Sequence, residues 1–234
     1  MSKPNPPNTT GTYNFAPSMG EAVLYSFGLA QVRRTALTQQ HFEDARMATN
    51  LLMARWSADG VNLWQVELCS FPLIQGCTTY PVPSNTIVML DAYYTINNGQ
   101  QEIDRIMTPI SRTEYANYPN KQQQGAPTVF WFDRLLAPTV TVWPAPNGQQ
   151  ACFKYYRLRQ TQDSGLSNGQ NVEIPIYFLE AYTFGLAHRM AMIWNPPLAP
   201  GLKAEYNESW GIASRQNIET ADTYISPMLN GYYR

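Results

Sequence analysis

The sequence has little charge for its length. Only 14% of its 234 residues are charged, against about a quarter in an average protein, and Lys plus Arg total 16 against 17 for Asp plus Glu. It therefore lacks the basic footprint that tight nucleic-acid binding requires. Because 44% of the residues are hydrophobic, the chain should fold, and much of its surface must be polar but neutral. Such a surface suits contact with other proteins.

Cysteine and histidine are too few to predict a chemical site. Cys69, Cys77 and Cys152 form no CxxC pair and have no histidine nearby, so we expect reduced, structural thiols. His41 and His188 lie on predicted helices without a partner at a catalytic or metal-site spacing. The sequence contains no Gly-rich phosphate loop, and its acidic residues are scattered through predicted strands. We therefore predict no catalytic residues, no metal and no cofactor.

Long apolar runs are also missing. No run approaches the roughly 18 residues of a membrane span, and the N-terminus lacks the apolar core of a signal peptide. We expect synthesis in the cytosol and no membrane partner. Residues 1–17 contain four prolines among several Asn and Thr residues, which predicts an extended arm.

A long amphipathic helix is the strongest feature that is present. Thr38 is placed to cap its start, and Gly60 should end it in the left-handed conformation. The predicted buried stripe consists of Phe42, Ala45, Thr49, Leu52, Met53 and Trp56. The helix should be roughly 30 Å long, so its stripe needs partner helices.

Three other segments can supply those partners. A first helix is predicted over 18–34, with Ala22, Val23, Phe27 and Ala30 on its apolar side. A second stripe follows Pro175 and consists of Ile176, Leu179, Thr183, Leu186, Ala187, Met190 and Ile193. A last helix is predicted over 200–223, with one side formed by Leu202, Tyr206, Trp210, Ala213 and Asn217.

Between the helices the apolar period changes to that of strands. Candidate strands are 67–71, 78–82, 86–96, 101–108, 128–134, 139–143 and 150–158, with a helical turn over 111–118. Asn98-Gly99 and Asn147-Gly148 favour hairpins. The predicted class is α+β: a four-helix bundle (18–66 and 172–223) with an inserted antiparallel β-sandwich or barrel (67–171).

Aromatic residues are plentiful, with 15 Tyr, 9 Phe and 6 Trp. The clusters Tyr93-Tyr94, Phe130-Trp131-Phe132, Trp143 and Tyr155-Tyr156 could form a stacking platform for sugars or single-stranded nucleic acid. We favour core plus protein interface, because alternate strand residues point to opposite faces. The tail, 224–234, should either fold back or dock into a neighbour through Tyr224, Ile225, Met228, Leu229, Tyr232 and Tyr233.

Short motifs follow one another in a recognisable order over residues 20–222. They are Thr38-x-x-His41, Asn50-Leu51-Leu52, Trp56-Ser57-Ala58-Asp59-Gly60, Tyr80, Ile110-Ser111, Glu114-Tyr115, Gly125-x-Pro127, Trp143-Pro144-x-Pro146, Pro175, Tyr177 and Ala181. This order resembles the head-to-tail adaptors of short-tailed bacteriophages, also called tail accessory factors or connectors. The resemblance lies in the order, since no single motif is chemically diagnostic.

The resemblance implies a structural, non-enzymatic virion protein. It implies a ring, usually of twelve copies, in the neck between portal and tail hub or nozzle, which passes double-stranded DNA without sequence specificity. It also implies that the C-terminal tail reaches the portal. The alternatives are a carbohydrate-binding or receptor-contacting tail component and, with least support, an enzyme acting on nucleic acid or glycan.

Overall fold

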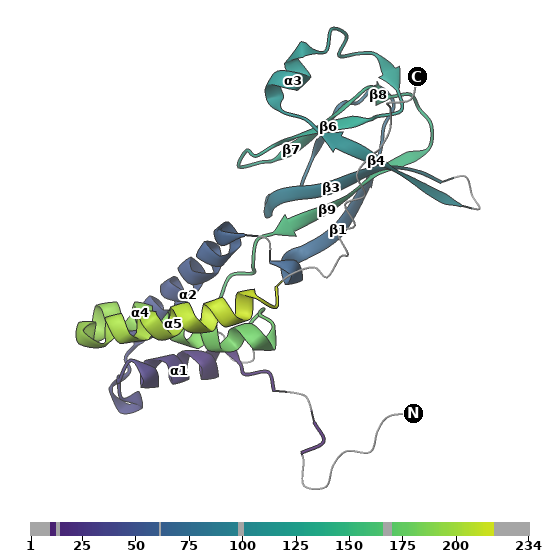
Figure 1. Ribbon diagram of the computed structural model, residues 1–234. Coiled ribbons are helices and arrows are strands. Elements are labelled where there is room, and N and C mark those ends of the chain that lie inside the picture. The colour runs from purple at the N-terminus through teal and green to yellow at the C-terminus, as the bar shows by residue number, and fades with distance from the viewer. Residues whose placement is uncertain (1–9, 13–14, 61, 98–100, 166–169, 218–234) are drawn as a thin grey trace, which may run out of the picture.

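The computed structural model describes residues 10–12, 15–60, 62–97, 101–165 and 170–217. The described residues form a mixed α+β structure with five α-helices and a curled seven-stranded sheet. The sheet lies at one end of the molecule and four of the helices at the other (Figure 1). None of the described helices combines the length and apolarity that a membrane crossing requires.

Four helices share one hydrophobic core. They are α1 (Met19–Leu29), α2 (Gln39–Asp59), α4 (Leu179–Trp194) and α5 (Ala199–Ser214). Helix α4 is at the centre, because it packs against each of the other three. Its Ala181, Tyr182 and Leu186 have no exposed surface. The helix at the centre of the core is therefore α4, whereas the long apolar stripe of α2 favours α2 for this position.

The helix starts follow the local sequence. The Ser18 hydroxyl accepts from the Glu21 N–H, and the Glu21 carboxylate accepts from the Ser18 N–H at 2.8 Å, which forms a capping box at the start of α1. Thr38 is the N-cap residue of α2, as predicted, and its N–H donates to His41 Nδ1 at 3.2 Å. Gly60 ends α2, as predicted, but the predicted left-handed conformation is wrong: its φ of 163° is extended backbone, which any residue adopts.

The predicted stripe of α2 is buried with one exception. Ala45, Thr49, Leu52, Met53 and Trp56 are all buried, but Phe42 lies at the edge of this face and is 37% exposed. His41 is buried in the first turn instead. Its ring stacks on Trp194 of α4, with the ring centroids 3.9 Å apart. The core therefore begins one residue earlier than the apolar pattern indicates.

The stripe predicted for α4 is only partly correct. Leu186, Ala187 and Met190 are buried, but Ile176 and Ile193 are 60% and 53% exposed. Ile176 belongs to the 3₁₀ turn before α4 (Ile176–Phe178). Because three helices surround α4, its buried face is wider than a single stripe. Helices α2 and α5 come close to α4 at Gly185, where an added Cβ would lie 2.9 Å from the Tyr206 ring and 3.0 Å from Leu52.

The buried faces of α1 and α5 agree with the predicted ones. In α1, Ala22, Val23, Phe27 and the C-cap Ala30 are buried. In α5, Tyr206 and Ala213 are buried, while Leu202 and Trp210 are half-buried against the same core. The prediction that this helix continues to 223 is wrong at its end, because α5 stops at Ser214 and residues 215–217, which include Asn217, are not helical. Residues 218–223 lie outside the described residues.

The seven long strands lie close to their predicted positions. They are β1 (Val66–Pro72), β2 (Thr79–Pro81), β3 (Thr86–Asn97), β4 (Glu102–Pro109), β6 (Val129–Asp133), β7 (Thr139–Trp143) and β9 (Ala151–Arg159). Their order in the sheet is β1-β9-β3-β4-β6-β7-β2. A short pair, β5 (Gln124–Gly125) and β8 (Ala145–Pro146), and the helix α3 (Arg112–Asn117) complete the structure.

The pairing of the strands corrects two predictions. Strands β3 and β4 form the expected hairpin, with its turn residues 98–100 outside the described ranges. Asn147-Gly148 does not join a hairpin, because β7 pairs with β6 and β2 while β9 pairs with β1 and β3. The intervening segment instead crosses between two parts of the sheet. Pairing is not purely antiparallel, since β4 and β6 are parallel.

One sheet encloses its own core by curling. Phe130 of β6 and Phe153 of β9 make an edge-to-face contact although their strands are not neighbours, with centroids 5.8 Å apart. Phe71 and Tyr80, on the two edge strands β1 and β2, stack at 4.9 Å. The structure thus has a curled seven-stranded sheet where a two-sheet sandwich or closed barrel was expected.

Side chains tie the helical end to the sheet at two crossings of the chain. Asn50 Oδ1 of α2 accepts from the Ser164 N–H at 2.7 Å, and Gln65 hydrogen-bonds to Thr161. The guanidinium of Arg159 pairs with the Glu173 carboxylate. Burial alone would raise the pKa of Glu173, but hydrogen bonds from Arg159 and the Gln162 N–H hold it below its usual value.

Candidate assembly surfaces

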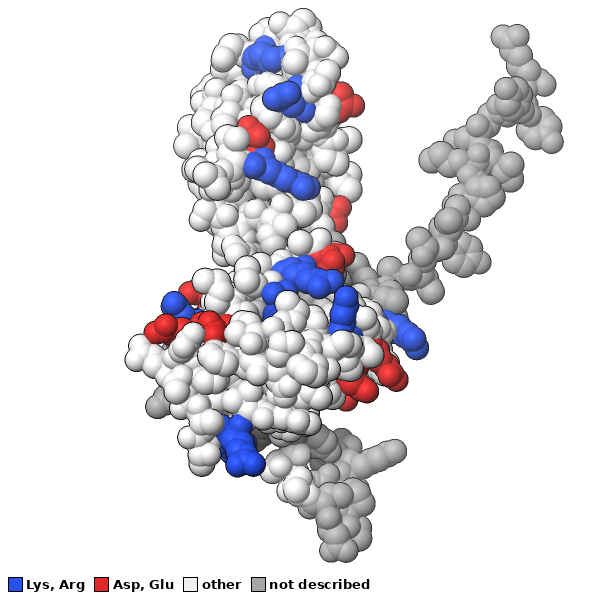
Figure 2. All heavy atoms as spheres, turned by 90° about the vertical axis from the view of Figure 1, so that its left-hand side faces the viewer, with Lys and Arg blue, Asp and Glu red and all other residues white. Residues whose placement is uncertain are grey.

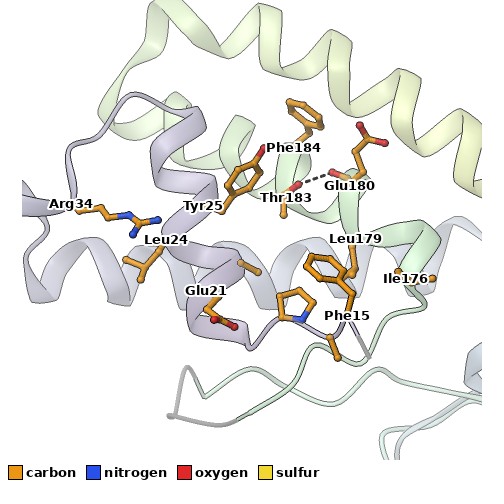
Figure 3. A pocket seen from close by; sticks show the side chains of 13 residues that line it. Phe15, Glu21, Leu24, Tyr25, Arg34, Ile176, Leu179, Glu180, Thr183 and Phe184 are labelled. Carbon is orange, nitrogen blue, oxygen red and sulfur yellow. Dashed lines mark hydrogen bonds between the residues drawn. The ribbon is translucent and has the colours of Figure 1, made fainter. Parts of the chain in front are cut away.

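A groove of about 950 Å³ runs along the outer side of α1 and α4. Its apolar walls include Phe15, Leu24, Tyr25, Ile176, Leu179 and Phe184 (Figure 3). Phe15, Tyr25 and Ile176 are 71%, 55% and 60% exposed. Large apolar side chains grouped around a cavity in this way mark a surface that another protein segment covers.

Three charged residues border the groove: Glu21, Glu180 and Arg34. The hydrogen bonds from the backbone and side chain of Ser18 lower the pKa of Glu21, so this carboxylate stays ionised near neutral pH. Glu180 is exposed. The groove therefore combines an apolar floor with a border that is more acidic than basic.

The outer face of α2 carries a second exposed apolar feature, which we call the α2 ridge (Met47, Leu51, Ala54 and Ala58). Met47 and Leu51 are 60% and 51% exposed, and they lie four residues apart on one helix face. Arg46 and Arg55 lie on either side of this line of residues and are also exposed.

A third apolar surface crosses the outer face of the sheet. Leu68 of β1 is paired in register with Tyr156 of β9, and Tyr93 of β3 with Ile106 of β4. The rings of Tyr156 and Tyr93 contact each other, with centroids 6.4 Å apart. Leu68 and Ile106 are 50% and 72% exposed. The apolar line thus spans four neighbouring strands.

The aromatic clusters alternate between the two faces of the strands. Tyr94, Phe130 and Tyr155 are at most 2% exposed, whereas Tyr156 is 38% exposed. This pattern supports the interpretation as core plus interface. The stacking platform is less well supported, because half of its predicted rings point into the protein.

Charges of both signs are interspersed on the face drawn in Figure 2, and most of that surface is uncharged. His188, Arg189 and Lys203 on α4 and α5 and Arg55 on α2 are near enough to influence one another. Burial, followed by the charges of Lys203, Arg189 and Arg55, lowers the pKa of His188. His188 is therefore neutral at pH 7.

The remaining residues considered as sites in the sequence are His41, the three cysteines and the residues of the C-terminal tail. His41 packs between Phe27 and Trp194 in the helical core, and the three cysteines are free thiols. Within the described ranges, no three His, Cys, Asp or Glu residues are grouped as metal ligands. The tail residues Tyr224, Ile225, Met228, Leu229, Tyr232 and Tyr233 lie outside the described residues, so their docking role remains a prediction.

Sequence patterns did not predict the groove. Its walls come from two distant segments, 15–34 and 176–184, which only the fold brings together. One signal was present: Leu24 and Tyr25 are apolar but lie off the buried face of α1, and Ile176 fits no buried position of α4. Large apolar residues off the core stripe are the pattern to look for.

A helical core joined to a curled sheet, with uncovered apolar surfaces on the helices and on the sheet, defines a structural assembly protein. The family model described as SU10 adaptor protein matches residues 29–228, and the chain belongs to this family of phage head-to-tail adaptors. The resemblance drawn from the order of motifs is thereby confirmed. No curated protein matches the chain. The protein is a structural adaptor of the phage particle.

Proposed function

We propose that the protein forms a ring of twelve copies in the virion neck, beneath the portal and above the tail hub or nozzle of a short-tailed phage. The ring joins these two parts and extends the channel through which double-stranded DNA leaves the head. This role is more specific than that of a head-to-tail adaptor in general.

The uncovered apolar surfaces carry this proposal. A cyclic ring repeats one heterologous interface, so each copy needs two different complementary surfaces. The α1–α4 groove and the α2 ridge are two such surfaces on one set of helices. Exposed apolar groups of this size are a liability in a monomer, and burial between copies removes the liability.

The near balance of charge supports a channel role. Lys plus Arg total 16 against 17 acidic residues. A lumen dense in basic groups would hold the DNA backbone tightly and with a steep salt dependence. A nearly neutral wall lets a polyanion slide.

The C-terminal tail is the proposed anchor to the portal. Residues 224–234 follow the helical segment and carry six large apolar or aromatic side chains. Each such group is worth roughly 1.5–3 kcal/mol when buried, against about 1–2 kcal/mol for ordering each residue. The proposal divides the chain into an arm (1–17), a helical part (18–66 and 172–223), a β part (67–171) and this tail.

The proposal is tested with purified protein and its portal. Mass photometry should show a monomer alone, and negative-stain images should show a ring on the portal when both are present, because a template lowers the cost of assembly. A protein that stays monomeric with its portal present would contradict the proposal.

A further inference from the structure

The groove and the α2 ridge lie on opposite sides of the helical core. Tyr182 of α4 faces α2, where its OH lies 3.4 Å from Thr49 Oγ1. Glu180, on the border of the groove, precedes Tyr182 by two residues, which is about 200° around the helix. The groove side of α4 therefore faces away from α2.

The same argument places the ridge. Thr49 and Leu52 of α2 are buried toward α4, and the Leu52 side chain lies against Gly185. Met47 precedes Thr49 by two residues, again about 200° around the axis, and is 60% exposed. The ridge therefore faces away from α4. Two different surfaces on opposite flanks are the arrangement that a heterologous, ring-closing contact needs.

The charges of the two surfaces are also complementary. Glu21 and Glu180 border the groove, and Arg46 lies beside the ridge. In the described part of the chain, none of these three side chains has an oppositely charged group within 4.0 Å. Arg34 in the groove has its counterpart in Glu43, which lies one turn before Met47 on the exposed side of α2. Each charged group named on one surface thus has a group of opposite sign on the other.

We propose that the α1–α4 groove of one copy receives the α2 ridge of the next copy. In this contact Met47 and Leu51 cover Tyr25 and Ile176, and Arg46 pairs with the carboxylate of Glu180. The proposal rests on the ring put forward above and identifies the surfaces that close it.

The test exchanges charges across the contact. E180R alone and R46E alone place like charges together at every interface of the ring, whereas E180R/R46E restores an opposite pair at each one. We expect each single variant to raise the concentration that half-saturates portals with rings at least tenfold, and the double variant to return it to within about threefold of wild type. The readout is the fraction of portals with a ring in negative-stain images across a titration.

A control and a second variant make the outcome decisive. E208R makes the same change at an exposed position of α5 outside both surfaces and should leave ring formation unchanged. L51D, which places a carboxylate in the middle of the ridge, should lose rings by at least tenfold while the monomer still folds. Glu208 is exposed and Leu51 is 51% exposed, so neither side chain belongs to the core.

The possible failures can be told apart. If wild-type rings form and the single charge variants match wild type, the interface lies elsewhere and this proposal is overturned, while the adaptor ring stands. Glu180 lies in the first turn of α4, so E180R should lower the melting temperature of the monomer by up to about 4 °C through the helix dipole alone. A larger fall would show that the groove is covered by the same chain, which also overturns the proposal. If wild-type protein forms no ring on its portal, both proposals fall.

Discussion

Replacing Trp56 with alanine should destabilise the helical core more than any other single truncation in α2. The side chain is 1% exposed, and its indole N–H donates to the Tyr206 hydroxyl at 3.0 Å. Its ring contacts Phe178 and Trp210, with centroids 5.6 and 4.8 Å away. Trp56 thus connects α2 to both C-terminal helices.

The expected cost is roughly 3–5 kcal/mol, since the change removes a large buried aromatic group and leaves a cavity. Trp56→Phe separates the two contributions. It keeps most of the packing but removes the donor to Tyr206, which should cost about 1–3 kcal/mol. For a chain of this size, each kcal/mol corresponds to about 2–4 °C in melting temperature.

Urea unfolding of the purified monomer measures these differences. The midpoint should fall for both variants, more for Trp56→Ala, while the slope stays the same. Trp131→Ala is the matched control: Trp131 is half-buried in β6 and contacts Tyr115 at 5.8 Å, so its loss should cost less than half as much. If Trp56→Ala unfolds at the same urea concentration as wild type, the account of the helical core is wrong.

Three further predictions follow from the structure. Gly185→Val should lower the free energy of unfolding in urea by about 1–3 kcal/mol, because even a Cβ would lie 2.9 Å from the Tyr206 ring, and Gly201→Val, at an open position, serves as control. Deleting residues 224–234 should leave the melting temperature unchanged and abolish portal binding in a pull-down; normal binding would reject the anchor role. The pKa of Glu173 is lower in the folded protein, so its pairing with Arg159 stabilises the fold above the unfolded value of 4.5 and is lost as pH falls through the folded pKa; Glu173→Gln should flatten the decline in stability measured across that acidic range.

The elements were easier to predict than their arrangement. The strand over 139–143 has a sequence that alternates with a period of two, and Pro138 and Pro144 bound it, so its limits are local properties of the chain. Pairing is not local: Asn147-Gly148 suits a hairpin, yet β7 and β9 have other partners in the curled sheet. A two-residue motif cannot encode which distant strand offers the better apolar face.

Local sequence patterns also could not predict the buried face of α4 or the groove, because both depend on contacts between distant segments. A single stripe describes a helix that packs on one side, but α4 packs against three helices, so Ala181 and Tyr182 are buried although they lie off the stripe. Ile176 precedes the helix and Ile193 lies in its last turn, where both are exposed. The groove needs 15–34 beside 176–184, a pairing that the order of motifs does not contain. The family itself could be predicted because the order of its motifs survives in the sequence.

The two crossings between helices and sheet also have a mechanical meaning. The chain passes from α2 to β1 and returns from β9 toward α4, and Gln65–Thr161 and Glu67–Arg159 connect residues of the two passages. A pull on the sheet is therefore shared by two backbone connections to the helices. The polar contacts between these connections resist sliding of one against the other. In an adaptor between head and tail, such a subunit transmits load from one end to the other without relying on a single linker.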